Sequence, residues 1–323
     1  MSVLYRTHCR DRQLIQSHFY PFSHPDKIKG MIIGNDLDSL LSASLLKKLF
    51  DWDVVAIYDY QTLWYAADCS FKENLLSGNY VAVDLDIYHS NIPSLGHHIL
   101  EISTDDSLKK HRLSLNPNFI RGISCQNFRK KYPLGTIHFL LWLFEVTLTQ
   151  DGGYLCWLAD SSFINGQSHR FKSNVKEWVC DYFQYEPFIE TLTMIDTQEF
   201  EKQLTGRIIN PLRELGLGSR SGQVQSRFNS ICGFQYQWTD PEQESSTIDH
   251  LCSFIQSVIN WKSPAFPKNY LKSRGVRQHC SLSKLYEHSG TLDKFLDFNN
   301  VFSYAFPFCD GINYTLFRKL NSS

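Results

Sequence analysis

An acidic pair, Asp36 and Asp38, stands between a short apolar run and a longer mixed stretch. The apolar run Met31–Ile33 predicts a buried strand, and Leu40–Phe50 has the spacing of an amphipathic helix. Two carboxylates at such a strand-to-helix turn suit a hard divalent cation. The open alternative is that one of them only caps the helix, because aspartate is a favoured N-cap residue.

Further carboxylates and imidazoles follow later apolar runs. They are Asp84 and Asp86 after Asn79–Val83, His97 and His98 after a glycine turn, and Asp160 after Gly153–Leu158. Because the carboxyl ends of parallel strands meet at one edge of a sheet, we expect these side chains to converge there. Aspartate and histidine without thiolate predict a dinuclear metal site.

These segments resemble the motifs of the DHH phosphoesterases. That family includes single-strand-specific exonucleases, phosphodiesterases of small oligonucleotides and cyclic dinucleotides, and manganese inorganic pyrophosphatases. The matching segments are GNDLDSLLSA, VAVDLD, LGHHI and LADSS, within about residues 30–175. The resemblance implies a two-metal site for Mn²⁺ or Mg²⁺ and the hydrolysis of a phosphoester. Its implied metal ligands are Asp36, Asp38, Asp84 (as the bridge), His97 and Asp160, with His98 as a catalytic residue that steadies the phosphate.

Three positions depart from the family's pattern. Ile32 and Gly34 stand where the first motif usually carries a histidine or aspartate, and Gly96 stands where the third motif has aspartate. The resemblance then implies one complete metal site and one that keeps only Asp36 and the shared Asp84. Replacement ligands would come from Asp86, His8 or water. The alternative to an enzyme is therefore a catalytically weakened protein that binds or sequesters a nucleotide or a protein partner.

Polar residues after the fourth motif are candidates for substrate binding. Arg170 can grip a phosphate through two guanidinium nitrogens. Asn165, His169 and Lys172 join it by proximity in the chain. The alternative for this segment is a solvated loop and the start of a helix.

Composition limits the partners. A net charge of −1 over 323 residues argues against a long, sequence-blind nucleic-acid footprint, which depends on neutralising many phosphates. A nucleotide or a short single-stranded nucleic acid is favoured instead. The nine cysteines form no CxxC pair, so zinc-ribbon and thioredoxin-like sites are excluded and a cytoplasmic protein with reduced thiols is expected. No apolar segment is long enough to predict a membrane span.

The order of elements predicts an α/β fold, a parallel sheet with flanking helices, followed by a smaller α+β C-terminal domain. Expected strands are 31–33, 54–58, 80–83 and 99–102, and expected helices are 40–50, 60–76, 136–148 and 197–215. A hairpin is expected from Val301–Phe306 and Ile312–Phe317 around an Asp-Gly turn. The expected domains are 1–190, the metal-binding phosphoesterase domain; 191–245, a helical connector and loop; and 246–323, the small C-terminal domain.

The sequence therefore predicts a metal-dependent phosphodiesterase. Within that class, a nuclease acting on single-stranded ends or short oligonucleotides agrees best with the charge balance.

Overall fold

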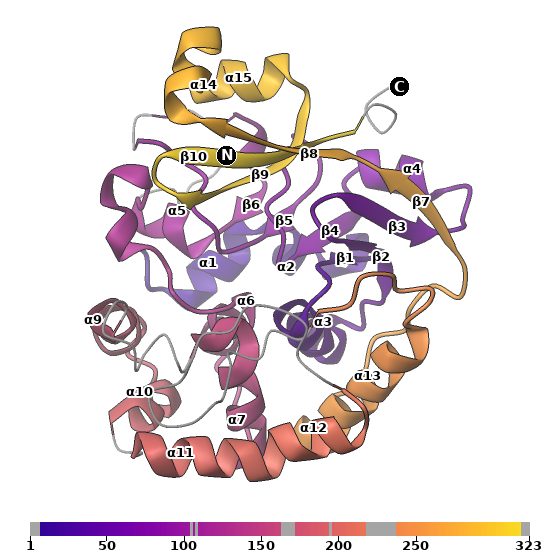
Figure 1. Ribbon diagram of the computed structural model, residues 1–323, viewed down its shortest axis with the longest axis vertical. Coiled ribbons are helices and arrows are strands. Elements are labelled where there is room, and N and C mark those ends of the chain that lie inside the picture. The colour runs from indigo at the N-terminus through magenta and orange to yellow at the C-terminus, as the bar shows by residue number, and fades with distance from the viewer. Residues whose placement is uncertain are drawn as a thin grey trace. The chain divides into compact units, whose positions relative to one another are not determined.

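The structure, a computed structural model, describes residues 7–103, 106, 109–162, 172–193, 196–217 and 237–317 (Figure 1). Its contacts divide the chain into two compact units. The first unit consists of Met1–Gly34, Trp52–Lys131 and Ala265–Ser323, and the second of Asn35–Asp51 and Tyr132–Pro264. The boundaries of these units differ from those of the expected domains 1–190, 191–245 and 246–323. The C-terminal segment belongs with the first part of the chain because it adds a strand to the same sheet.

The first unit is built on a sheet of seven strands in the order β6-β5-β4-β1-β2-β3-β7. Their bounds are β1 (Gly30–Ile33), β2 (Val54–Tyr58), β3 (Thr62–Ala66), β4 (Tyr80–Val83), β5 (Ser94–Leu95), β6 (Ser114–Leu115) and β7 (Tyr270–Arg274). The five strands from β6 to β2 are parallel, and β3 is antiparallel to both of its neighbours. Every residue of β1 and β4 is buried, as the continuous apolar runs of parallel strands require. The predicted strands at 31–33, 54–58 and 80–83 are confirmed.

A second, antiparallel sheet of the first unit has the order β8-β10-β9. Its strands are β8 (Val276–Ser281), β9 (Val301–Phe308) and β10 (Gly311–Leu316), and α14 (Leu282–Ser289) and α15 (Leu292–Phe298) lie beside it (Figure 1). Only Gly275 separates β7 from β8, so the chain passes directly from one sheet to the other. The turn after Phe308 confirms the predicted hairpin.

One face of the large sheet is covered by α4 (Phe71–Leu76) and by the small sheet. Side chains of α4 pack with Ile32, Ala56 and Ala82 of the sheet and with Phe302. The Tyr58 hydroxyl lies 2.6 Å from the Ser303 hydroxyl. The remaining helices of this unit are short: α1 (Arg12–His18), α2 (Tyr20–Ser23), α5 (Pro117–Arg121) and the 3₁₀ turns Pro25–Lys27, Lys109–His111 and Cys125–Lys130.

The second unit is helical in its described residues. Its helices are α3 (Leu37–Phe50), α6 (Thr136–Leu143), α7 (Gln150–Leu158), α9 (Lys172–Lys176), α10 (Glu186–Thr193), α11 (Thr197–Leu204), α12 (Asn210–Glu214) and α13 (Ser245–Ile259), with π-helical turns at Glu177–Phe183 and Thr205–Ile209. The expected helix over 197–215 is confirmed as this continuous run of α11, π-helical turn and α12. Every residue of α3 from Leu37 to Lys47 is buried, so the helix predicted as amphipathic is covered nearly all round.

Four segments differ from the predicted secondary structure. The helix expected over 136–148 ends at Leu143, as α6. Tyr60–Leu76, expected as one helix, divides into β3 and α4, and Ile99–Ile102 forms no strand. Gly153–Leu158 belongs to α7, so Asp160 follows a helix and not a strand. A short apolar run does not distinguish strand from helix by its periodicity. Here Thr149 starts the helix, because its hydroxyl accepts the Gly152 N–H at 3.1 Å.

Candidate functional site

Asp84 lies at the carboxyl edge of the large sheet, in the first unit. β4 pairs with β1 in parallel register, with Val83 opposite Ile33, and Asp84 is the next residue. Its φ of 59° is in the left-handed region, which few residues other than glycine adopt and which is enriched at functional sites. The main chain therefore turns sharply at the point where the carboxylate leaves the sheet.

His97 is the partner of this carboxylate. Its Nδ1 lies 3.1 Å from Asp84 Oδ1, and the two side chains are 14% and 5% exposed. Two ligands that each sit about 2.1 Å from one metal ion, at tetrahedral or octahedral angles, are separated by about 3–3.5 Å. The pair therefore has the spacing of two ligands on one ion.

Asp86 is engaged differently, as an anchor for His98. Its Oδ2 accepts the backbone N–H of His98 at 3.2 Å and lies 2.9 Å from His98 Nδ1. Its Oδ1 accepts an N–H from Asn116 at 3.1 Å, and the side chain is 1% exposed. An ionised carboxylate only accepts hydrogen bonds, so His98 Nδ1 carries a proton and donates. The ring is thus fixed while its side chain stays 37% exposed.

The glycine at position 96 is explained by the same carboxylate. A Cβ built on Gly96 would lie 2.2 Å from Asp86 Oδ1 and 2.4 Å from its Cγ. Any side chain there would displace Asp86. Position 96, where the DHH pattern has aspartate, is glycine in this chain. The space that a side chain at position 96 would fill is occupied by the buried carboxylate of Asp86.

Two asparagines that the sequence analysis did not single out hold the histidine pair. Asn118 donates to the carbonyl of His97 at 2.8 Å, and Asn116 donates to the carbonyl of His98 at 3.0 Å. Asn116 also caps α5, because its Oδ1 accepts the Asn118 N–H at 2.9 Å. The signal in the sequence is Asn-Pro-Asn, a favoured N-cap residue followed by proline at the first helical position.

Asp36 and Asp38 belong to the second unit, where both serve helix ends. Asp36 caps α3, and its Oδ1 accepts from the N–H and hydroxyl of Ser39 at 3.0 and 2.9 Å. The capping alternative is therefore confirmed for Asp36. Asp38 accepts the N–H groups of Thr136 and Ile137 at 2.6 and 2.9 Å, at the N-terminus of α6.

The position of Asp38 follows from a missing cap on α6. The N-cap residue of that helix is Gly135, which has no side chain to accept a hydrogen bond. The carboxylate of Asp38 supplies the acceptors, and the positive end of the helix dipole favours its charge. A Cβ on Gly135 would lie 2.7 Å from Asp38 Cγ, so this approach requires glycine.

Asp160 lies near Asp38 in the second unit. Both carboxylates act on the buried hydroxyl of Tyr132, whose pKa is raised well above its usual value by burial first, then by Asp38 and Asp160. Tyr132 donates to the carbonyl of Gly135 at 3.0 Å. Asp160 has a φ of 50°, in the left-handed region, as Asp84 does.

The predicted substrate-binding residues are mostly not described. Asn165, His169 and Arg170 lie outside the described residues. Lys172 is exposed at the start of α9. The substrate-binding prediction for this segment therefore stays a prediction.

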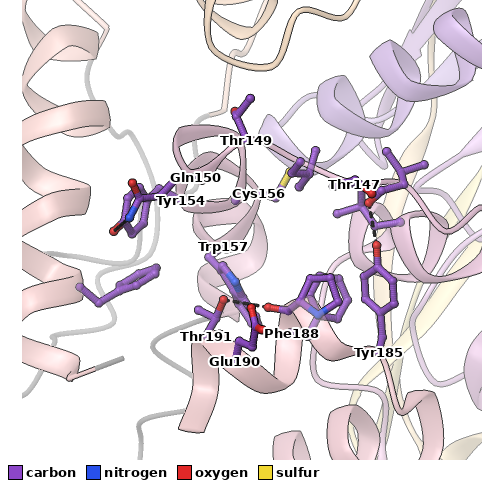
Figure 2. Close-up of a pocket in the computed structure, with 16 residues that line it drawn as sticks. Thr147, Thr149, Gln150, Tyr154, Cys156, Trp157, Tyr185, Phe188, Glu190 and Thr191 are labelled. Carbon is purple, nitrogen blue, oxygen red and sulfur yellow. Dashed lines mark hydrogen bonds between the residues drawn. The ribbon is translucent and has the colours of Figure 1, made fainter. Parts of the chain in front are cut away.

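A separate cavity of about 480 Å³ lies in the second unit (Figure 2). It is lined by aromatic side chains of α7 and α10 and of the segments beside them, including Tyr154, Trp157, Tyr185 and Phe188. The Tyr185 hydroxyl donates to the carbonyl of Val146 at 2.6 Å. None of the described metal-ligand candidates lines this cavity.

Among the helices of the described residues, none combines the length and apolar character needed to cross a membrane. Comparison of the chain with family models, curated proteins and solved structures finds no match.

Proposed function

We propose that this protein is a metal-dependent phosphoesterase that uses the carboxyl edge of the large sheet. The observation that carries the proposal is the pair of Asp84 and His97, whose ligand atoms are 3.1 Å apart. A buried carboxylate and an imidazole at that spacing fit a divalent cation such as Mn²⁺. The resemblance to DHH phosphoesterases, with the same two residue types in the same order, supports the chemistry.

The resemblance also implies further acidic ligands, Asp36 and Asp38. Ile33 pairs with Val83, so the chain that leaves β1 starts its turn level with Asp84. Asp36 and Asp38 follow three and five residues after Ile33. The roles of Asp36, Asp38 and Asp160 as ligands stay predictions.

In this proposal some residues would bind the metal ion and another would contact the substrate. When bound, the metal would supply charge neutralisation at the phosphoryl oxygens and an acidified water as nucleophile. Asp84 and His97 would hold the ion. His98, whose ring is held by Asp86 through Nδ1, would face the phosphate with its other nitrogen, Nε2.

The test is a panel of phosphoesters with Mn²⁺ or Mg²⁺: single-stranded DNA, short RNA, cyclic dinucleotides and pyrophosphate. Asp84→Asn keeps the shape of the side chain and removes its charge, so we expect it to abolish metal-dependent hydrolysis. Asp26→Asn is the matched control, because Asp26 is 71% exposed in the same unit. Full activity in Asp84→Asn would overturn the proposal.

A second candidate function is nucleotide binding without turnover. It is favoured because the second metal site that the resemblance implies lacks ligands in this chain. The side chains of Ile32 and Gly34 have no ligand atoms, and both oxygens of Asp86 are hydrogen-bonded to His98 and Asn116. This function predicts tight nucleotide binding with no hydrolysis of any member of the panel under either metal.

A further inference from the structure

The segment that joins the two sheets of the first unit is strongly basic. Residues 261–286 contain six lysines and arginines and no aspartate or glutamate, in a chain whose net charge is −1. β7 and β8 form the core of this segment and run on from one another (Figure 1). Each is the edge strand of its sheet.

Two of its arginines point into solvent. Arg274 ends β7 and Arg277 is the second residue of β8, and both are exposed. Within the described part of the chain, neither forms an ion pair. An unpaired guanidinium in water is available to a phosphate and can bind it through two nitrogens.

Arg277 is near the histidine pair by a short series of contacts. It lies opposite Thr315 in the register of β8 and β10. The Thr315 hydroxyl donates to the carbonyl of Tyr60. The ring of Tyr60 lies 6.1 Å from the ring of His98, edge to face. One strand pairing, one hydrogen bond and one ring contact therefore connect Arg277 to the candidate site.

Gly275 makes this approach possible. Its N–H donates to the carbonyl of Gln61 at 2.7 Å. A Cβ there would lie 2.7 Å from Thr315 Cγ2 and 2.8 Å from the carbonyl oxygen of Leu316. Only glycine lets the chain pass so close to the turn after β2. Arg274 comes just before this glycine in the sequence, and Arg277 comes two residues after it.

Arg274 lies at the same edge of the large sheet as Asp84. β7 is antiparallel to β3, which is antiparallel to β2, so β7 ends where β2 and β4 end. From β4 to β7 there are four strand spacings, or about 19 Å at roughly 4.8 Å each. A pyrophosphate does not span that distance, whereas an oligonucleotide does.

An acidic residue, Asp59, lies at the turn between β2 and β3, beside this surface. Its Oδ1 accepts the N–H of Gln61 at 2.8 Å and also the N–H of Thr62. Its charge is therefore partly balanced by the turn that it stabilises. Asp59 and Arg277 act in opposite directions on the pKa of the buried Tyr58, and burial is the larger effect.

We propose that Arg274 and Arg277 bind backbone phosphates of a single-stranded oligonucleotide that lies along the carboxyl edge of the sheet. This inference rests on the proposed function and narrows its substrate class to nucleic-acid strands rather than pyrophosphate. Two phosphate contacts are enough to orient a strand and agree with the near-neutral charge of the chain.

The binding test needs no metal and no turnover. Fluorescence anisotropy with a labelled octathymidylate in EDTA compares the wild type with the double variant Arg274→Gln/Arg277→Gln. We expect at least about tenfold weaker binding and a salt slope smaller by roughly 1.4, at about 0.7 per phosphate on a single strand. The matched control is Lys268→Gln/Lys284→Gln, which removes two exposed charges from the same segment.

Wild-type affinity in the arginine double variant would overturn the inference. An equal loss of affinity in the lysine control would also overturn the inference, because it would indicate that the net positive charge of the segment, and not the two arginines, attracts the strand. Equal affinity for the matching duplex would overturn it as well. If the wild type hydrolyses the octamer, the arginine variant should raise KM for the octamer by a larger factor than KM for a dinucleotide. If no substrate is hydrolysed, the proposed function fails and the anisotropy result still decides the role of the arginines.

Discussion

Two aspartates two residues apart, Asp84 and Asp86, have different surroundings at the carboxyl edge of the sheet. Asp84 faces the imidazole of His97. Asp86 is held by the backbone and ring of His98 and by Asn116, which occupy both of its oxygens. Asp86 is therefore a positioning residue in the proposed site rather than a replacement metal ligand.

Asp86→Asn separates these roles. The amide nitrogen of asparagine would meet the His98 Nδ1–H as a second donor, or its oxygen alone would keep a weaker bond, so His98 loses its fixed orientation. We expect kcat to fall about 10- to 100-fold while Mn²⁺ affinity, measured by calorimetry, stays at the wild-type value. A loss of Mn²⁺ affinity as large as in Asp84→Asn would make Asp86 a ligand and contradict this assignment.

His111 predicts a pH dependence of stability. Burial lowers the pKa of this 2%-exposed histidine to about 4, although Asp86 acts in the opposite direction. Between pH 6.5 and 4 the unfolded chain binds a proton that the folded chain does not, so stability falls as the pH falls. From pH 7 to 5 the loss should be about 2 kcal/mol.

The measurement is urea unfolding at pH 7 and 5 for the wild type and His111→Gln, in which the residue no longer titrates. We expect the difference between the two pH values to shrink by that amount in the variant. Burial raises the pKa of Glu101 to about 9, so its contribution weakens the fold as the pH rises and is common to both proteins. An unchanged difference would place the His111 pKa near its ordinary value.

At the scale of elements, close approaches to strand ends and helix ends depend on glycine. Gly96 lies against Asp86, Gly135 against Asp38 and Gly275 against Thr315. In each case a carboxylate or another strand occupies the place of the missing side chain. The absence of a side chain at these three glycines therefore allows the close contacts.

Gly96→Ala tests this packing. Its Cβ would overlap the carboxylate of Asp86, and forcing an extra carbon into such a place typically costs about 1–3 kcal/mol. Gly153→Ala is the control, because nothing lies within 4 Å of a Cβ there and the residue is inside α7. We expect that change to be neutral or to stabilise by up to about 1 kcal/mol. Equal unfolding midpoints for Gly96→Ala and the wild type would show that Asp86 moves away without cost.

At the scale of the whole molecule, the first unit is assembled from three separate segments of the chain. β7 pairs with β3 across more than 200 residues of sequence, with Arg274 opposite Thr62. A ligand that binds the folded first unit therefore stabilises contacts from distant parts of the chain.

Metal binding should be visible as stability. An ion that binds only the folded chain stabilises it by about 3 kcal/mol at roughly 100 times its Kd. We expect Mn²⁺ to raise the thermal midpoint of the wild type and of Asp26→Asn, and EDTA to reverse the rise. The rise should be absent in His97→Ala, which lacks one proposed ligand. A wild-type rise in that variant would place the metal elsewhere.

The sequence by itself determined the elements whose signals are local. Continuous apolar runs predicted β1, β2 and β4, and an Asp-Gly turn between two aromatic runs predicted the β9–β10 hairpin. The adjacent histidines and the aspartates at strand ends were likewise visible as candidates. These predictions from the sequence agree with the structure because burial of a strand and the geometry of a tight turn depend on few neighbouring residues.

Only the tertiary structure decided which partner each candidate faces. The pairing of Asp84 with His97, of Asp86 with His98, and of Asp38 with the start of α6 joins residues 12 to 98 positions apart. The return of β7 to the large sheet is decided in the same way, and so is the hydrogen bond to Tyr60 from Thr315, the strand partner of Arg277. Hydrogen-bond partners and steric fit at such separations depend on the packing of whole elements, which no local pattern of residue types records.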